Sequence, residues 1–231
     1  MKAVRVNHLV KKYHEHKPHE ALILNDISLS IDAGEFCTIV GPSGSGKSTF
    51  LKCISGLETV TSGEVVVDDQ AITKFTKREL ETFKRKDISF VFQEYNLIDD
   101  LTLLENICLD HPLTEEINQL IDEWDLRKVI HFFPNQCSGG QQQKTAILRA
   151  LIRKSKILFC DEPTGALDTK SSRDVLNVLK LIQKKYGTTI ILITHHDIIK
   201  KISNKIITIK DGEIVSIKNN EQVLDVNEVI L

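Results

Sequence analysis

Glycine, hydroxyl and lysine residues between positions 41 and 49 have a spacing that suits the binding of phosphate groups. The segment fits the pattern G-x-x-x-x-G-K-[ST] at every fixed position. Its glycines let successive backbone N–H groups point at phosphate oxygens, and the start of the next helix adds partial positive charge. A flexible Gly/Ser turn is the weaker alternative, because the pattern is complete. We therefore expect a nucleoside triphosphate to contact Gly41, Ser43, Gly44, Gly46, Lys47, Ser48 and Thr49.

Two side chains of this segment supply what phosphate chemistry needs. Lys47 brings a positive charge to the β- and γ-phosphates. The Ser48 hydroxyl is the expected ligand of Mg²⁺, a hard cation that takes its other ligands from phosphate, carboxylate and water oxygens. The apolar run 36–40 predicts a buried strand before the segment and residues 47–55 predict a helix after it, which is the context the pattern requires.

Two adjacent carboxylates, Asp161 and Glu162, follow the apolar run 157–160. Ligands usually bind at the carboxyl ends of parallel strands, so one carboxylate can hold Mg²⁺ while the next faces a water molecule. An ordinary acidic junction between a strand and a loop explains the pair equally well when it is taken alone. The phosphate-binding pattern upstream favours the functional interpretation.

A second anion site is predicted where Ser138, Gly139 and Gly140 open a helix, because a hydroxyl and free N–H groups meet there. Taken alone, the motif is equally a simple N-cap. The order of the three motifs, however, resembles that of the ATP-binding cassette family, the nucleotide-binding subunits of ABC transporters. This resemblance runs from about Tyr13 to Ile217.

The resemblance implies roles for further residues. Tyr13 falls where the family places an aromatic ring that stacks on adenine, and Gln93 matches the loop glutamine that contacts Mg²⁺ and the membrane partner. Residues 165–168, which end in Asp168, match the loop that crosses to the other subunit, and His195 matches the switch histidine at the γ-phosphate. Simpler readings exist for three of them: a half-buried surface aromatic for Tyr13, a strand cap for Gln93 and a helix N-cap for Asp168.

The resemblance also implies a mechanism. Two cassettes would face each other head to tail, so that ATP binds between the phosphate loop of one and Ser138, Gly139, Gly140 and Gln141 of the other. Catalysis would then consist of positioning and electrostatic stabilisation. The implied catalytic groups are Glu162, which orients or deprotonates the water, His195, Gln93 and Lys47, and the implied Mg²⁺ ligands are Ser48, Gln93 and Asp161.

Within the family, residues 92–97, 105–107 and 161–168 look most like the branch of the macrolide exporter, the lipoprotein-release system and the bacitracin-type peptide-resistance transporters. We expect the ATPase subunit of a bacterial exporter of an antimicrobial peptide, lipid or related amphipathic cargo, acting with a second cassette and an integral-membrane permease. A cell-division cassette that signals without transport is the alternative, because its motifs would be the same. Cys137, Lys144 and a short segment 93–137 depart from the family pattern.

The elements that must position these groups follow from apolar periodicity and turn residues. We expect an α/β fold: a P-loop NTPase core with a parallel sheet, an N-terminal antiparallel β subdomain and an inserted helical subdomain at about 96–153, in one cassette domain over 1–231. The residues predict strands at 3–6, 22–31, 64–67 (an edge strand), 88–92, 157–160 and 189–193, a hairpin at 205–217, and helices at 76–86, 101–109, 114–124, 139–153 and 171–185. The polar tail from 218 predicts a frayed end.

Composition limits the remaining function classes. The 231 residues include 30 Lys and Arg against 32 Asp and Glu, so no basic field favours nucleic acid. The five cysteines have no short paired spacing, which indicates reduced thiols in the cytosol. Without a long apolar run or a leader, we expect a peripheral protein on the cytoplasmic face of the cell membrane. The histidines at 14, 16 and 19 lack a supporting ligand framework and predict a solvated loop rather than a metal site.

Overall fold

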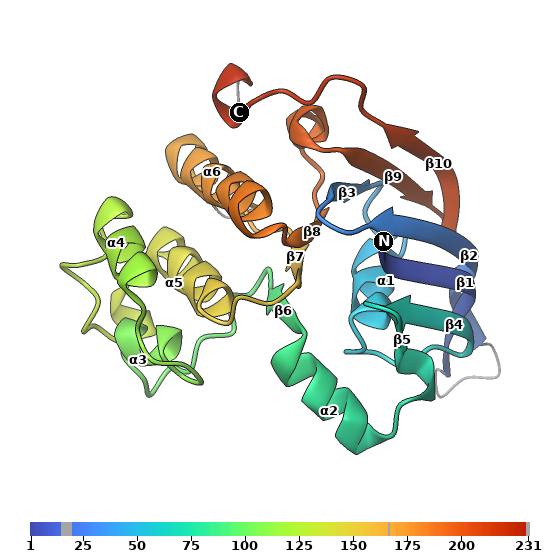
Figure 1. The fold of residues 1–231 in the computed structure, drawn as a ribbon, viewed down its shortest axis with the longest axis horizontal. Coiled ribbons are helices and arrows are strands. Elements are labelled where there is room, and N and C mark those ends of the chain that lie inside the picture. Colours follow the sequence, from blue (N-terminus) through green and yellow to red (C-terminus); the bar gives the residue numbers. More distant parts are fainter. Residues whose placement is uncertain (15–19, 166, 230–231) are drawn as a thin grey trace.

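The computed structural model describes residues 1–14, 20–165 and 167–229, which form two sheets and the helices around them (Figure 1). In the larger sheet the strand order is β10-β9-β3-β8-β7-β6. Neighbours are parallel throughout, except that β10 pairs with β9 in the antiparallel sense. Its strands are β3 (Phe36–Val40), β6 (Ile88–Val91), β7 (Ile157–Asp161), β8 (Thr189–Ile193), β9 (Lys205–Lys210) and β10 (Glu213–Asn219).

The register of this sheet brings several strand ends to one edge. Ile193 of β8 lies opposite both Ile39 of β3 and Asp161 of β7. The loops that leave β3, β7 and β8 therefore begin side by side at their carboxyl ends, where open parallel sheets bind ligands. All residues of these three strands are buried, because both faces of the sheet are covered.

Alternate residues of the central strands enter different hydrophobic cores. Leu158, Cys160 and Leu192 pack with the helices on one face, whereas Phe159 and Ile191 pack on the other face with the first helix and the small sheet. Successive side chains of a strand point to opposite faces of the sheet. Because both faces pack against a hydrophobic core, the central strands are continuous apolar runs.

The smaller sheet is antiparallel with the order β2-β1-β4-β5, as the sequence predicts for the N-terminal region. Its strands are β1 (Lys2–His14), β2 (Glu20–Asp32), β4 (Ser62–Val67) and β5 (Gln70–Ala71). The prediction that 64–67 is an edge strand is wrong, because β5 folds back on β4 and takes the edge. The turn between them passes through Asp68 and Asp69, both at positive φ, which is a two-residue hairpin turn.

Six α-helices are present among the described residues: α1 (Lys47–Ile54), α2 (Lys77–Lys86), α3 (Leu103–Ile107), α4 (Glu115–Glu123), α5 (Gly139–Leu151) and α6 (Thr169–Tyr186). Short 3-10 segments lie at η1 (Ile72–Lys74), η2 (Pro134–Gln136), η3 (Asp197–Ile202) and η4 (Val226–Glu228). Side chains of Thr76, Thr102, Thr114, Ser138 and Asp168 accept hydrogen bonds from the backbone at the starts of helices α2 to α6.

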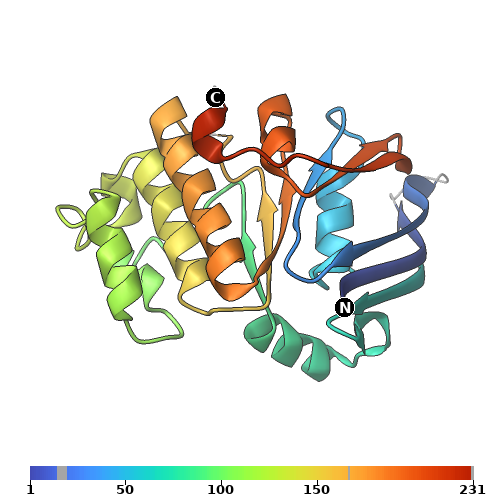
Figure 2. The same cartoon turned by 45° about the horizontal axis from the view of Figure 1, so that its top comes forward.

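Helices α3, α4 and α5 group together at one end of the molecule, and the small sheet lies at the other (Figures 1 and 2). The α3 helix is shorter than the predicted 101–109, since Cys108 already caps it. The end of the chain also differs from expectation over the described residues. Val226 and Val229 are buried, and the carbonyl oxygen of Val229 accepts a hydrogen bond from Arg173 of α6, so this part of the tail packs rather than frays.

Candidate nucleotide-binding site

The loop between β3 and α1 has a backbone that side chains at its glycines would disturb. Gly41 has a φ of 153°, and a Cβ atom there would lie 1.9 Å from the carbonyl oxygen of Ile209. Gly44 has a φ of 76°, and a Cβ atom there would meet no atom of the described residues within 4 Å. The backbone at Gly44 therefore borders open space, as a phosphate cradle requires.

This open space is a depression of about 580 Å³ at the carboxyl ends of the parallel strands. It gathers ten of the residues that the sequence predicts for the site, together with one that it misses. The lining residues are Ile23, Gly41, Ser43, Gly44, Gly46, Lys47, Ser48, Thr49, Gln93, Glu162 and His195. Ile23 comes from β2, and only the approach of the small sheet to the loop brings it there.

Lys47 and Ser48 already have fixed positions at the start of α1. Lys47 is 8% exposed, and its Nζ donates to the carbonyl oxygen of Pro42 at 2.7 Å, across its own loop. Ser48 donates to Oδ1 of Asp161 at 3.1 Å. Burial raises the pKa of Asp161, the Ser48 hydrogen bond opposes this effect, and the neighbouring Glu162 charge adds to it.

Glu162 is held at the mouth of β7 in a left-handed conformation with a φ of 47°. Its backbone N–H donates to the carbonyl oxygen of Ile193 at 3.1 Å, which ties the end of β7 to the end of β8. Its Oε2 atom lies 3.2 Å from Nδ1 of His195. A left-handed non-glycine residue costs energy and is often found at functional sites. The neighbouring His196 does not line the depression.

Tyr13 lies apart from the lining residues and is 37% exposed. The Nζ atom of Lys11 stands 4.6 Å from the centroid of its ring. Partial burial, followed by the charge of Glu58, raises the pKa of the Tyr13 hydroxyl, whereas the charge of Lys11 and, after it, a hydrogen bond with Thr49 lower it. The ring is therefore next to the phosphate loop, through Thr49, rather than inside the depression.

The Ser-Gly-Gly motif faces a separate depression of about 340 Å³. Ser138 and Gln141 form a capping box at the start of α5: Gln141 N–H donates to the serine hydroxyl at 3.3 Å, and Gln141 Oε1 accepts from Ser138 N–H at 2.9 Å. Asp168 also borders this depression and caps α6 by accepting from Ser171 N–H at 3.0 Å. Both readings of Asp168 are thus compatible.

Gly139 does not line this second depression, because it faces Tyr95 instead; a Cβ atom at Gly139 would lie 2.8 Å from the tyrosine hydroxyl. The sequence also did not predict four further residues of the lining: Trp124, Asp125, Lys144 and Ser171. Ala166, and the histidines at 16 and 19, lie outside the described residues. Among the residues that the structure describes, none is shared by the two linings, so the phosphate loop and the Ser-Gly-Gly motif are on different surfaces of one chain.

A phosphate loop, an acidic strand end beside it and a separate Ser-Gly-Gly helix start together define an ATP-binding cassette. Comparison with family models agrees with this class, since the model described as ABC transporter matches residues 24–165. The chain belongs to the ABC transporter family and is an ATP-hydrolysing subunit of that family. Among the residues that the structure describes, no helix is long and apolar enough to cross a membrane.

Curated relatives include both export and import proteins. The chain is 36% identical over 213 residues to the bacitracin export ATP-binding protein BceA of Halalkalibacterium halodurans, with 89% of the chain and 84% of the relative covered. It is 41% identical over 209 residues to the macrolide export ATP-binding/permease protein MacB of Aggregatibacter actinomycetemcomitans, covering 87% of the chain and 32% of that protein. It is 37% identical over 221 residues to the methionine import ATP-binding protein MetN of Haemophilus influenzae, covering 92% of the chain and 64% of that protein.

A solved structure is similar over nearly the whole chain. It is the dimeric, post-hydrolysis state of the ATP-binding cassette MJ0796 bound to ADP and Pi, with a TM-score of 0.87 and 35% identity over 94% of this chain and 98% of the other. The predicted fold class, family and ATPase activity are thereby confirmed.

Proposed function

We propose that the chain is the ATPase subunit of a bacterial ABC exporter that moves an antimicrobial peptide, a lipid or a related amphipathic cargo through a separate permease. The similarity to BceA and MacB supports export. The similarity to MetN makes import the main competing direction. The cargo need not touch this chain, so its identity depends on the membrane partner.

Two copies of the chain would bind ATP between them. The single observation that carries this proposal is the separation of the two half-sites: the phosphate loop and the Ser138 motif line different depressions of one chain. A head-to-tail dimer brings each loop opposite the Ser138 motif of the other copy. The γ-phosphate would then favour the closed dimer, and its loss would release it.

The residues where the start of α1 meets the end of β7 fit Mg²⁺. Ser48 and Asp161 present two oxygen atoms 3.1 Å apart beside the phosphate loop, and oxygen ligands are what this hard cation requires. Gln93, at the rim of the same depression, would supply a third oxygen. When bound, Mg²⁺ neutralises negative charge on the β- and γ-phosphates.

The chain's own side chains would position the reaction. Glu162 would accept a proton from the attacking water or orient it, and His195, 3.2 Å from that carboxylate, would contact the γ-phosphate. Lys47 would exchange its bond to Pro42 for phosphate oxygens. Tyr13, next to Thr49, would stack on adenine at the edge of the loop. Gly139, Gly140, Gln141 and Asp168 would act on the nucleotide of the other copy.

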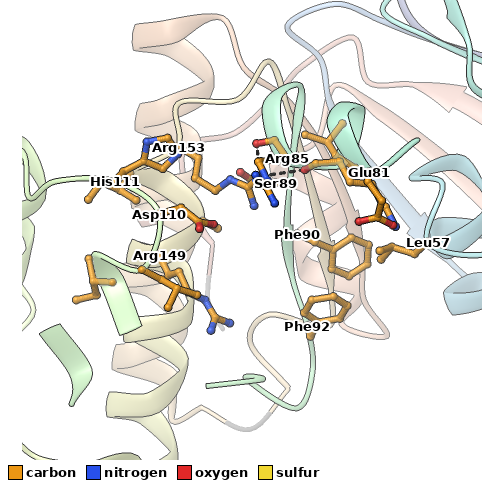
Figure 3. A pocket seen from close by; sticks show the side chains of 16 residues that line it. Leu57, Glu81, Arg85, Ser89, Phe90, Phe92, Asp110, His111, Arg149 and Arg153 are labelled. Carbon is orange, nitrogen blue, oxygen red and sulfur yellow. Dashed lines mark hydrogen bonds and ion pairs between the residues drawn. The ribbon is translucent and has the colours of Figure 1, made fainter. Parts of the chain in front are cut away.

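A groove of about 400 Å³ is the proposed docking place of the permease (Figure 3). One wall is aromatic, with Phe90 and Phe92 stacked at a centroid distance of 4.3 Å. Arg149 and Arg153 form the opposite wall (Figure 3). A docked segment that carries apolar side chains and carbonyl or carboxylate oxygens would suit the aromatic wall and the arginine wall together.

The test is purification of tagged Glu162→Gln protein from its native membranes with ATP, followed by mass spectrometry of what accompanies it. We expect a permease with a large extracellular part to be purified together with the chain. Arg85→Glu, which reverses a charge lining the groove, should reduce its recovery, and Lys218→Glu on the exposed strand β10 should not. An importer's permease would overturn the direction, a division-machinery protein would favour a signalling cassette, and no membrane partner would refute both.

A further inference from the structure

The chain passes directly from the docking groove to the nucleotide site at two consecutive residues. Phe92 lines the groove and Gln93 lines the nucleotide depression. We call residues 92–97 the Gln93 loop. Because this loop touches both sites, whatever holds it in place can influence the position of Gln93.

The Gln93 loop is bent into a conformation that needs outside support. Tyr95 and Asn96 are both left-handed, with φ of 41° and 48°. Such residues persist only when surrounding contacts over-determine them. The loop has a tight internal turn, in which Asn96 N–H donates to the carbonyl oxygen of Glu94.

Arg149 of α5 provides that support. Its guanidinium donates to the carbonyl oxygen of Asn96 at 2.7 Å and to that of Tyr95 at 2.9 Å. Two donors of one planar group thus hold two successive left-handed residues. A lysine ammonium lacks this rigid arrangement of donors. Burial, and secondly the charge of Arg153, lower the pKa of Arg149.

A second contact joins the same loop to the start of α5. The hydroxyl of Tyr95 is so close to Gly139 that a Cβ atom added at Gly139 would lie 2.8 Å from it. Gly139 and Arg149 are ten residues apart on the helix, or about 15 Å along its axis. The loop therefore meets α5 at two points: a close approach beside the Ser138 motif, and the hydrogen bonds of Arg149 on the groove wall.

We propose that Arg149 is a positioning residue of the ATPase reaction: it fixes the Gln93 loop to α5, so that Gln93 takes its place in the nucleotide site according to the position of α5. This inference rests on the proposed role of Gln93. It makes α5 the element through which docking in the groove and contact with the second cassette both reach that glutamine.

The test compares steady-state ATPase rates and ATP dissociation constants of the purified chain. Arg149→Met removes both hydrogen bonds and should lower kcat about 10-fold, corresponding to about 1.4 kcal/mol in the barrier, with ATP affinity within about 2-fold of the parent. Arg149→Lys, which keeps the charge and one donor group, should recover part of the rate. Arg153→Met is the matched control, because Arg153 lines the same groove but donates to the carbonyl oxygens of Lys84 and Arg85 and not to the loop.

The double variant Gln93→Ala with Arg149→Met separates positioning from general stability. If Arg149 acts through Gln93, Arg149→Met should cause no further loss of kcat in a chain that already carries Gln93→Ala. Additive losses, equal falls for Arg149→Met and Arg153→Met, or an unchanged kcat in both Arg149 variants while Gln93→Ala is impaired would overturn the inference. A normal rate in Gln93→Ala would instead refute the proposed role of Gln93 itself, and with it the part of the inference that depends on that residue.

Discussion

Adding one methyl group to the phosphate loop separates nucleotide binding from folding. Gly44 and Gly187 have similar backbones, with φ of 76° and 66°, and a Cβ atom at either would meet nothing within 4 Å in the described part of the chain. Gly44 lines the nucleotide depression, whereas Gly187 caps the end of α6. Gly44→Ala and Gly187→Ala are therefore a matched pair that differs in place but not in local strain.

Both variants should lose about 1 kcal/mol of unfolding free energy. An L-residue in the left-handed region costs about 1–2 kcal/mol, and the reduced entropy of the unfolded chain offsets part of that. Only Gly44→Ala places a methyl group where phosphate oxygens would approach. Loss of one hydrogen bond to a charged group is worth about 1.5–3 kcal/mol, so its ATP dissociation constant should rise by about 10- to 100-fold.

The assay is isothermal titration calorimetry with ATP, together with urea unfolding of each variant without nucleotide. Gly187→Ala should bind ATP as the parent does. Equal ATP affinities in the two variants, at equal stabilities, would refute the assignment of the open space at Gly44 to phosphate. A much larger stability loss in Gly44→Ala than in Gly187→Ala would show that the two backbones are not equivalent.

Three further perturbations have expected outcomes. Glu162→Gln should lower kcat by about 10²- to 10⁴-fold without weakening ATP binding, since the amide keeps the shape but loses the basicity, and normal turnover would remove Glu162 from that role. Asn106→Leu should cost about 3 kcal/mol in urea unfolding and leave ATP affinity intact, because the fully buried amide accepts from Ile98 N–H and donates to three carbonyl oxygens; a loss below about 1 kcal/mol would contradict this. Burial lowers the pKa of Lys180 to about 8, so the unfolded state holds more protons above that pH and stability should rise with pH. From pH 7.5 to 9.5 the parent should gain about 1–2 kcal/mol relative to Lys180→Met, and identical pH slopes would refute it.

Local signals predicted those parts of the fold that depend on neighbours in sequence. The run Thr189–Ile193 forms a strand with the predicted bounds, because five buried residues in a row satisfy both faces of a covered sheet. Thr76 and Asp168 cap helices where their side chains can reach the backbone three residues on. The phosphate loop is equally local, since its backbone geometry follows from its own glycines.

Features that depend on distant partners escaped prediction. The pairing of Gln70–Ala71 with β4, which makes β4 an inner strand, depends on a turn of two aspartates rather than on glycine. Val226 belongs to a polar tail in the sequence, but it is buried because the tail packs against α6 and η3. The hydrogen bonds from Arg149 could not be predicted, because their acceptors are backbone carbonyl oxygens, which do not depend on the type of residue. Ile23 enters the nucleotide site only because two sheets approach each other there.

The central claim is that the ATP-binding site is complete only between two copies of the chain. Light scattering of Glu162→Gln protein tests this directly: saturating ATP should convert the 26.1 kDa chain into a dimer of about twice that mass, and ADP should not. Adding Ser138→Arg to that protein should keep it at 26.1 kDa with ATP. A chain that stays monomeric with ATP bound, or a dimer that tolerates the change at Ser138, would contradict the account.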